Sequence, residues 1–234
     1  MGNYGRGMEG QATRNSSLIQ AVFFDLDGTL YDRDAAVLQT AHSQFEAFRG
    51  DLGNVTQSVF VERLVALDAH GHNRTPRLHH VLAEELGFSS MVADGLETHF
   101  RSNFPKSCRV SPDTLATLKT LRTRGLKVGM ITNGPTYWQT LKIESMGIAP
   151  LFDAILISGS EGIEKPDPRI FARAVERCGV TASESMFVGD HPEADILGAK
   201  AAGLVPIWKR MAYWSVPDEV QRIERISEIL PLIG

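Results

Sequence analysis

The chain has 234 residues, of which 43% are hydrophobic and 22% are charged, and its formal net charge is −4. This composition is typical of a globular protein with one large domain, or with a domain that carries an insertion. The acidic balance argues against a broad nucleic-acid-binding surface, which would need clustered basic residues. No apolar stretch approaches the roughly 18 residues needed to span a membrane.

The cysteines and the N-terminus bear on cellular location. Cys108 and Cys178 have no close partner and no metal-type spacing, so we expect reduced thiols and a cytoplasmic protein. Residues 1–19 begin with four glycines in the first ten positions and contain no apolar run like that of a signal peptide. We therefore predict a disordered leader over residues 1–19.

A long helical block follows the first predicted strand, which is the apolar run 21–24. Apolar residues recur at helical spacing, and Gly50, Gly53, Gly71, Gly87 and Pro105 separate the helices. The predicted helices cover residues 35–48, 56–69, 76–86 and 91–104. Such a block is far longer than an ordinary connection between elements. The pattern therefore predicts an inserted helical subdomain over residues 33–105.

Strands and helices alternate from residue 111 onward. The predicted strands are 126–131, 154–157, 185–188 and 204–208, and the predicted helices are 112–124, 136–146, 168–177, 192–202 and 217–230. Strands that are separated by helices indicate crossover connections and a parallel sheet. The sequence therefore predicts a doubly wound α/β core, formed by residues 20–32 and 106–234, with an inserted helical subdomain.

The first predicted strand leads into two carboxylates and a glycine turn. Asp25 and Asp27 are one residue apart, so in an extended segment both side chains point to the same side. Gly28 then allows a tight turn. In open parallel sheets ligands bind beyond the carboxyl ends of the strands. A carboxylate pair at that edge is suited to a hard cation and to phosphoryl transfer.

The later strands deliver complementary groups to the same edge. Thr132 and Asn133 offer a hydroxyl and backbone amides to phosphate oxygens. Lys165 supplies a point charge, and Asp190 and Asp195 follow the fourth strand. Each of these groups taken alone is commonly a turn, a cap or a solvated side chain. Together, in order, they predict a metal and phosphate site.

These motifs make the sequence similar to the haloacid dehalogenase-like hydrolase superfamily over roughly residues 20–230. Asp25-Leu26-Asp27-Gly28-Thr29 resembles its first motif, Thr132 the second, Lys165 the third, and Gly189-Asp190 with Asp195 the fourth. The helical block lies where that family carries its helical cap. The resemblance therefore implies a cap inserted into a hydrolase core.

The resemblance also implies roles for the individual residues. Asp25 would be the nucleophile that forms an aspartyl-phosphate, and Asp27 would protonate the leaving oxygen and then deprotonate the attacking water. Mg²⁺ would be held by the Asp25 carboxylate, the Asp27 backbone carbonyl and Asp190. Thr132 and the Asn133 amide would bind the phosphoryl group, Lys165 would neutralise Asp25 and a phosphate oxygen, and Asp195 would orient the metal waters or Lys165.

Several functions remain open on these motifs. The dehalogenase and phosphonate-cleaving branches lack the second aspartate, so Asp27 favours a phosphatase. The substrate would be a small phosphorylated metabolite, such as phosphoglycolate, a sugar phosphate or a nucleotide. A phosphomutase, a 2-haloacid dehalogenase and a non-catalytic metabolite-binding protein are the alternatives. We expect a monomer or a homodimer that binds neither nucleic acid nor membrane.

The helical block holds the candidates for substrate choice. Arg74 or Arg77 could bind an anionic leaving group, and Tyr31 could line the entrance or pack at a hinge. Four histidines lie nearby in sequence, namely His70, His72, His79 and His80. Their spacing matches no standard metal site, so a polar loop between helices is the favoured interpretation over a second metal.

Overall fold

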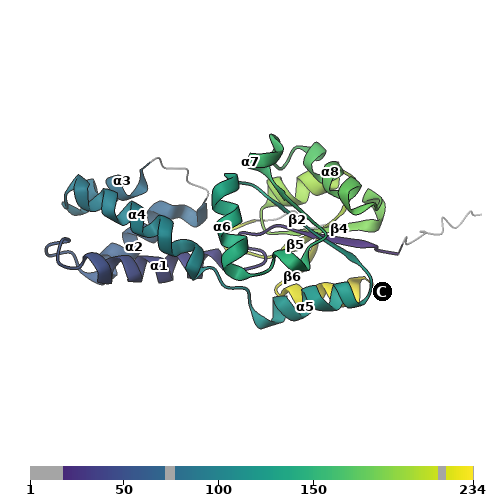
Figure 1. Cartoon of the computed structure of the whole chain (residues 1–234), viewed down its shortest axis with the longest axis horizontal. Coiled ribbons are helices and arrows are strands. Elements are labelled where there is room, and N and C mark those ends of the chain that lie inside the picture. The colour runs from purple at the N-terminus through teal and green to yellow at the C-terminus, as the bar shows by residue number, and fades with distance from the viewer. Residues whose placement is uncertain (1–17, 72–76, 216–219, 234) are drawn as a thin grey trace, which may run out of the picture.

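A computed structural model describes residues 18–71, 77–215 and 220–233 of the chain (Figure 1). Most of the predicted leader lies outside these residues. The strands are β1 Ala21–Phe24, β2 Lys127–Thr132, β3 Ala154–Ile157, β4 Ser185–Gly189, β5 Val205–Lys209 and β6 Gln221–Ile223. The helices are α1 Arg33–Phe48, α2 Gln57–Asp68, α3 Leu78–Leu86, α4 Ser90–Ser107, α5 Pro112–Thr123, α6 Thr136–Met146, α7 Ser158–Glu161, α8 Pro168–Cys178 and α9 Gly198–Ala201.

The six strands form one sheet in the order β3-β2-β1-β4-β5-β6, and every neighbouring pair is parallel. β1 lies between β2 and β4, so the chain leaves β1 toward one side of the sheet and later returns to its other side. The predicted doubly wound α/β fold is therefore confirmed. The point where the order reverses lies at the carboxyl end of β1, where such sheets bind ligands.

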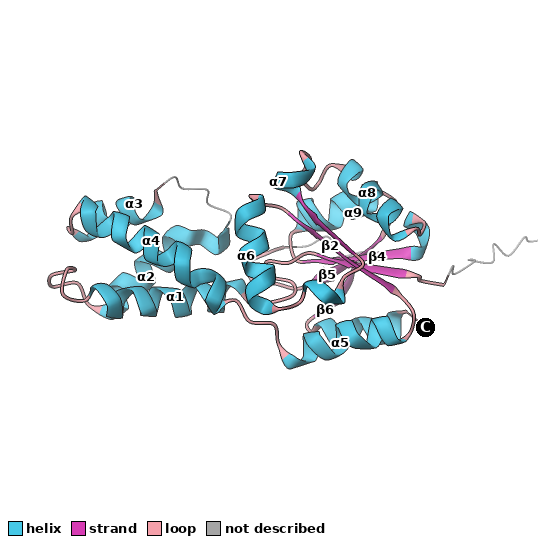
Figure 2. Ribbon diagram, viewed as in Figure 1, coloured by secondary structure: helices cyan, strands magenta, loops and turns pink. Residues whose placement is uncertain are grey.

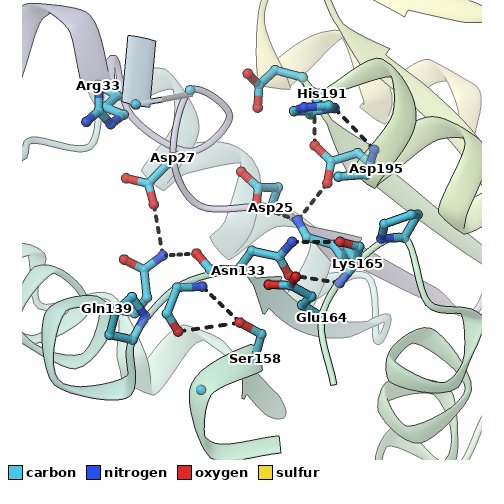
Figure 3. Close-up of a pocket in the computed structure, with 18 of the residues that line it drawn as sticks. Asp25, Asp27, Arg33, Asn133, Gln139, Ser158, Glu164, Lys165, His191 and Asp195 are labelled. Carbon is cyan, nitrogen blue, oxygen red and sulfur yellow. Dashed lines mark hydrogen bonds and ion pairs between the residues drawn. The ribbon is translucent and has the colours of Figure 1, made fainter. Parts of the chain in front are cut away.

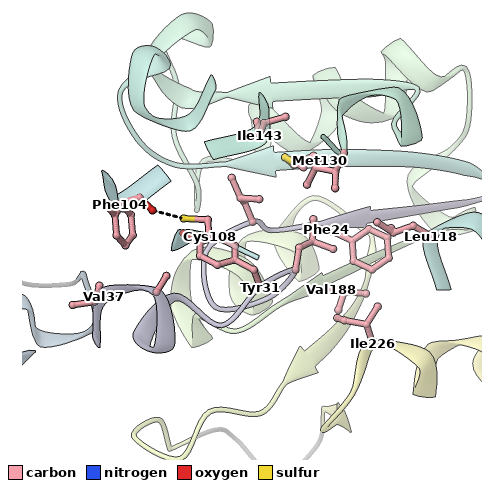
Figure 4. Close-up of a cluster of buried hydrophobic side chains, with 14 of the residues drawn as sticks. Phe24, Tyr31, Val37, Phe104, Cys108, Leu118, Met130, Ile143, Val188 and Ile226 are labelled. Carbon is pink, nitrogen blue, oxygen red and sulfur yellow. Dashed lines mark hydrogen bonds between the residues drawn. The ribbon is translucent and has the colours of Figure 1, made fainter. Parts of the chain in front are cut away.

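Helices cover both faces of this sheet (Figure 2). Phe23 and Phe24 are adjacent on β1 and fully buried, yet they belong to different hydrophobic clusters because strand side chains alternate between faces. Phe23 packs with residues of α8 and α9, and Phe24 with residues of α5 and the C-terminal segment. Figure 4 shows that the Phe24 cluster continues past Tyr31 and Cys108 to Val37 and Phe104 of the helical block.

The first four helices, α1 to α4, form a separate helical group beside the sheet (Figure 1). Side chains of Asp32, Thr56 and Ser89 cap the amino ends of α1, α2 and α4 by accepting hydrogen bonds from backbone amides. The two connections between the group and the sheet run side by side, since Tyr31 forms an isolated antiparallel bridge to Val110.

Two expectations about helix ends were wrong. Pro105 was expected to end the preceding helix at residue 104. It lies inside α4 instead, and the helix continues to Ser107. The predicted closing helix over residues 217–230 is absent from the described residues of that range. Gln221–Ile223 instead pairs with β5 as the edge strand β6, and Ile226–Leu232 forms a 3-10 helix that buries Ile226 and Ile229. Pairing with an exposed sheet edge outweighs a helical pattern of apolar residues here.

The predicted helix over residues 192–202 is present in two parts. Pro192–Leu197 is π-helical, and α9 continues directly from it. Among the described residues, no helix is both long enough and apolar enough to cross a membrane.

The contact between β1 and β2 generates a stability prediction. Gly129 on β2 pairs with Phe23, and a Cβ atom at Gly129 would lie 2.3 Å from Cδ1 of the buried Phe23 ring. Gly129→Ala should therefore lower the free energy of unfolding by about 1–3 kcal/mol, as for other overpacked cores. Urea denaturation measures this change. Gly50→Ala is the matched control, because a Cβ there meets nothing within 4 Å. Equal stability of the two variants would contradict the packing described here.

Candidate active site

The polar groups at the carboxyl ends of β1, β2 and β4 surround one cavity of about 1190 Å³. Its walls come from both parts of the molecule. The sheet side contributes Asp25, Asn133 and Asp190, and the helical group contributes Arg33 and His70. Figure 3 shows Asp25, Asn133 and Lys165 lying close together in this cavity, although they come from separate segments of the chain. The strand-end residues that the sequence singled out are thus brought together by the fold.

Lys165 lies at the bottom of this site between two aspartates. Its ammonium Nζ is 2.5 Å from Oδ1 of Asp25 and 2.6 Å from Oδ1 of Asp195, and all three side chains are buried. Burial works against the charged lysine, but Asp195 and Asp25 outweigh it and raise the pKa of Lys165. Lys165 is therefore a permanent cation within reach of anything bound at Asp25.

Asn133 fixes the backbone of Lys165. Its side-chain amide donates a hydrogen bond of 2.8 Å to the Lys165 carbonyl, and its Oδ1 accepts one of 2.9 Å from the Lys165 amide. The loops after β2 and β3 are therefore tied together. The sequence analysis assigned a role only to the backbone amide of Asn133. The structure shows that its side chain also holds the backbone of Lys165.

Three buried carboxylates form a group that could hold a metal ion. Asp25, Asp190 and Asp195 each offer an oxygen, and these oxygens lie within 4.8 Å of one another. Asp190 is oriented by the Thr29 hydroxyl, which donates to its Oδ1 over 3.1 Å. Gly28 is required beside it, since a Cβ there would lie 2.7 Å from Oδ2 of Asp190. Carboxylate oxygens in a compact group are the ligands that hard divalent cations prefer.

The charge balance of this group also fits a cation. Burial, and then the neighbouring Asp195 and Asp27, raise the pKa of Asp25 to about 7 despite the opposing effect of Lys165. Burial, followed by Asp25 and Asp195, raises the pKa of Asp190 well above its ordinary value. Lys165 brings one positive charge to three carboxylates, so the group would carry a negative excess when all three are ionised, and a divalent cation would neutralise that excess in place of protons. The donor set therefore fits a hard divalent metal.

Asp27 is oriented differently from the sequence-based expectation. β1 ends at Phe24, so the alternation of an extended strand does not carry on to Asp27. Its carboxylate turns toward α6, where Lys142 Nζ lies 2.5 Å from Oδ1 and 2.6 Å from Oδ2 and Gln139 donates to Oδ2 over 2.8 Å. Burial opposes ionisation of Asp27, but Lys142 and then Arg33 outweigh it and hold its pKa well below the usual range.

Gln139 and Lys142 were missed by the sequence analysis. Both are buried on one face of α6, three residues apart, and Gln139 also donates to the Thr132 hydroxyl. Thr132 lies at the end of β2 and is bonded to Gln139, which lines the cavity, and its role in binding phosphate stays a prediction. The sequence did contain a signal for them, because a glutamine and a lysine three residues apart share one face of the predicted helix 136–146.

Of the candidates for substrate choice, the two described residues, Arg77 and Tyr31, do not line the cavity. Arg74 is outside the described residues, and Arg77 bonds to His80 rather than lining the cavity. Tyr31 is buried, donates its hydroxyl hydrogen bond to Asp27, and bridges to Val110, where the two connections between the helical group and the sheet run side by side. The arginine of the helical group that does line the cavity is Arg33, held by Asp68 at 2.6 and 2.9 Å.

The described histidines of the helical group face separate partners. His70 bonds to Asp34 and stacks on Tyr213 with ring centroids 3.7 Å apart, whereas His79 contacts Gln44. His80 bonds to Asp94, and His72 lies outside the described residues. The only group of metal-type ligands among the described residues is the one at Asp25.

Comparison with known proteins identifies the family. Residues 19–203 match the haloacid dehalogenase-like hydrolases. The chain belongs to this family. The resemblance read from the four motifs is confirmed, and with it the assignment of the chain as a hydrolase.

Individual relatives span nearly the whole chain. A glyceraldehyde 3-phosphate phosphatase of Methanopyrus kandleri is 31% identical over 92% of this chain and 97% of its own length. The crystal structure of a phosphatase of the family from Thermococcus onnurineus is 26% identical, with a TM-score of 0.65 over 92% of this chain and 98% of that one. A 2-haloacid dehalogenase from Pseudomonas syringae is 29% identical, with a TM-score of 0.60 and the same coverage.

The charge balance of the hydrolase predicts how its stability depends on pH. The pKa of Asp190 is raised in the folded state, so the unfolded chain loses this proton first as the pH rises. The contribution of Asp190 to the free energy of unfolding is therefore full at low pH, and it is lost as the pH rises above the ordinary pKa of an aspartate. Without divalent cation, Asp190→Asn should be more stable than the wild type by about 1 kcal/mol or more at about pH 8.

Urea denaturation in chelator at about pH 5 and pH 8 measures this difference. The advantage of the variant should shrink at the lower pH, where Asp190 is protonated. Added Mg²⁺ should stabilise the wild type and have little effect on the variant. A wild type that is more stable than Asp190→Asn in chelator at the higher pH would contradict the charge balance described above.

Proposed function

We propose that this hydrolase is a Mg²⁺-dependent phosphatase that acts on a small phosphorylated metabolite through an aspartyl-phosphate on Asp25. The observation that carries the proposal is the buried group of Asp25, Asp190 and Asp195 around Lys165, with Asp27 beside the same cavity. A site built only to bind a metabolite has no need for a second, separately held carboxylate next to the nucleophile.

The residues of the site divide the reaction between them. Asp25 attacks phosphorus, and the electron pair of the breaking bond leaves with the substrate oxygen. Lys165 is already bonded to Asp25 Oδ1, so it holds the nucleophile in place and faces the charge of the transferring phosphoryl group. Thr132 and the Asn133 amide bind phosphoryl oxygens, and Asp195 orients Lys165.

Asp27 serves as the acid and then as the base. Lys142 keeps this carboxylate ionised, which is the form that takes a proton from the attacking water in the second step. For the first step a monoanionic phosphate ester would bring the proton that Asp27 passes to the leaving oxygen. The Asp25 and Asp190 carboxylates and the Asp27 backbone carbonyl would hold Mg²⁺. When bound, the ion neutralises part of the charge that otherwise keeps carboxylate and phosphate apart.

The helical group would act as the cap of the enzyme, with residues 33–105 closing over a core of residues 20–32 and 106–234. Arg33 and His70 of the group line the cavity together with core residues, and His70 stacks on Tyr213 of the core. A closed cap would exclude bulk water while leaving room for one attacking water. It would also favour small metabolites over phosphoproteins.

We infer that the substrate is a phosphate ester, as the names of the phosphatase relatives suggest, and not a haloacid. Asp27 is the deciding residue, since carbon–halogen hydrolysis does not use an acid at this position. Glyceraldehyde 3-phosphate is the first substrate to test, because a relative that covers 92% of the chain is named as a phosphatase of this compound. The cytoplasm is the proposed location, supported by the two buried, unpaired thiols of Cys108 and Cys178.

Phosphate release from a panel of phosphorylated metabolites tests this function. Glyceraldehyde 3-phosphate, phosphoglycolate, sugar phosphates and nucleoside monophosphates should be assayed with Mg²⁺ and with chelator. Wild type should release phosphate only with Mg²⁺, and Asp25→Asn should lose at least about a thousandfold of that rate because its amide cannot form the acyl phosphate.

The controls separate the alternatives. Asp167→Asn replaces an aspartate that caps α8 away from the cavity and should retain full activity. Chloride release from a 2-haloacid, or transfer of phosphate between sugar positions without net release, would favour the dehalogenase or the mutase. Binding of metabolites without any turnover would favour a non-catalytic protein.

A further inference from the structure

The carboxylate of Asp27 is held from two sides. The Tyr31 hydroxyl donates to Oδ1, Gln139 donates to Oδ2, and the ammonium of Lys142 reaches both oxygens at 2.5 and 2.6 Å. Arg33 also lies near, but its guanidinium is engaged by Asp68. Among the described residues, Lys142 is therefore the cation within hydrogen-bond distance of Asp27.

The two oxygens of Asp27 have unequal surroundings. Tyr31 is buried and does not line the cavity, so Oδ1 faces the protein interior. Gln139 lines the cavity, and its amide nitrogen also contacts the Thr132 hydroxyl and, over 3.1 Å, the Asn133 carbonyl. Two N–H groups are shared among three acceptors, so Gln139 cannot hold all three fully, and a bound group at the cavity can take its place at Oδ2 while Gln139 keeps its other partners.

We propose that Lys142 is a positioning residue, which together with the Tyr31 hydroxyl fixes Asp27 so that Oδ2, and not Oδ1, faces the reacting groups. The proposal rests on the phosphatase function described above. It gives a buried lysine on α6 a role in the reaction, although Lys142 touches neither the nucleophile Asp25 nor Lys165 in the structure.

The proton transfers then take place at one atom. In the first step a monoanionic phosphate ester brings the proton that the ionised Asp27 lacks, and this proton passes through Oδ2 to the leaving oxygen as its bond to phosphorus breaks. In the second step the water oxygen bonds to phosphorus, its proton moves to Oδ2, and the bond between phosphorus and Asp25 breaks with its electron pair returning to the Asp25 carboxylate. Each transfer requires Oδ2 to be held at the cavity.

Stability alone does not account for the ion pair. Burying a lysine and an aspartate removes the hydration of both charges, and apolar residues of similar volume often serve a fold equally well or better. The pair at Lys142 lies beside the cavity, in contact through Gln139 with the predicted phosphate-binding residue Thr132. A positioning role explains why charged partners occupy this place.

Pre-steady-state kinetics with p-nitrophenyl phosphate test the proposal. The nitrophenolate leaves without needing a proton, whereas hydrolysis of the aspartyl-phosphate needs Asp27 as a base. In Lys142→Met the burst of nitrophenolate should therefore change by less than about threefold in rate, while the steady-state rate falls about tenfold or more. Lys142→Arg, which keeps a cation for Asp27, should recover most of the loss.

The matched control is Lys127→Met. Lys127 is also a lysine in an ion pair with an aspartate, Asp153, but it is half-exposed and lies outside the cavity. This variant should behave as the wild type. A Lys142→Met enzyme with an unchanged steady-state rate, or with both phases slowed equally, would overturn the positioning role.

Failure of the proposed function gives a different result. Wild type that releases no nitrophenolate in Mg²⁺ would overturn the phosphatase function and the positioning role together, whereas a normal wild type with an unaffected Lys142→Met would overturn only the latter.

If Lys142→Met alone does not fold, the double variant Asp27→Asn with Lys142→Met leaves no unpaired charge. The role predicts that the double variant is no slower than Asp27→Asn, and an additional loss would contradict it.

Discussion

The ion pairs of Lys165 are the interaction on which the rest of the site depends. Three carboxylates are buried at the carboxyl edge of the sheet, and burying such charges without a partner is strongly unfavourable. Lys165 bonds to two of them, and Asn133 holds the Lys165 backbone through both its amide and its carbonyl. When all three are ionised, one ammonium leaves a negative excess, and a divalent cation held by these carboxylates would neutralise it.

The same loop holds two aspartates with opposite properties. Burial raises the pKa of Asp25, whereas Lys142 lowers that of Asp27, although only Leu26 separates them. Each carboxylate has its own lysine from a different element, Lys165 for Asp25 and Lys142 for Asp27. The lowered pKa of Asp27 suits its proposed role as a base, and the raised pKa of Asp25 means that a bound cation would be needed to keep the proposed nucleophile ionised.

The helical group supplies one part of the cavity wall, and we propose that this part governs substrate choice. The strand ends hold the groups that would bind a phosphoryl group, whereas Arg33 and His70 come from the helices and face the remainder of the space. Relatives with the same fold are named as phosphatases and as a dehalogenase, so the fold by itself leaves the leaving group open. The contact of His70 with Tyr213 connects the helical group to the sheet beside this space.

The sequence by itself determined the fold class and the motif residues at the strand ends, because periodicity and strand-end chemistry are local signals. Asp25, Lys165, Asp190 and Asp195 meet as those signals predicted. Only the tertiary structure decided the direction of the Asp27 carboxylate and its pairing with Lys142, since these depend on where β1 ends and how α6 packs. The same holds for β6, which forms because β5 offers a free edge, a partner that no local pattern around residue 221 encodes.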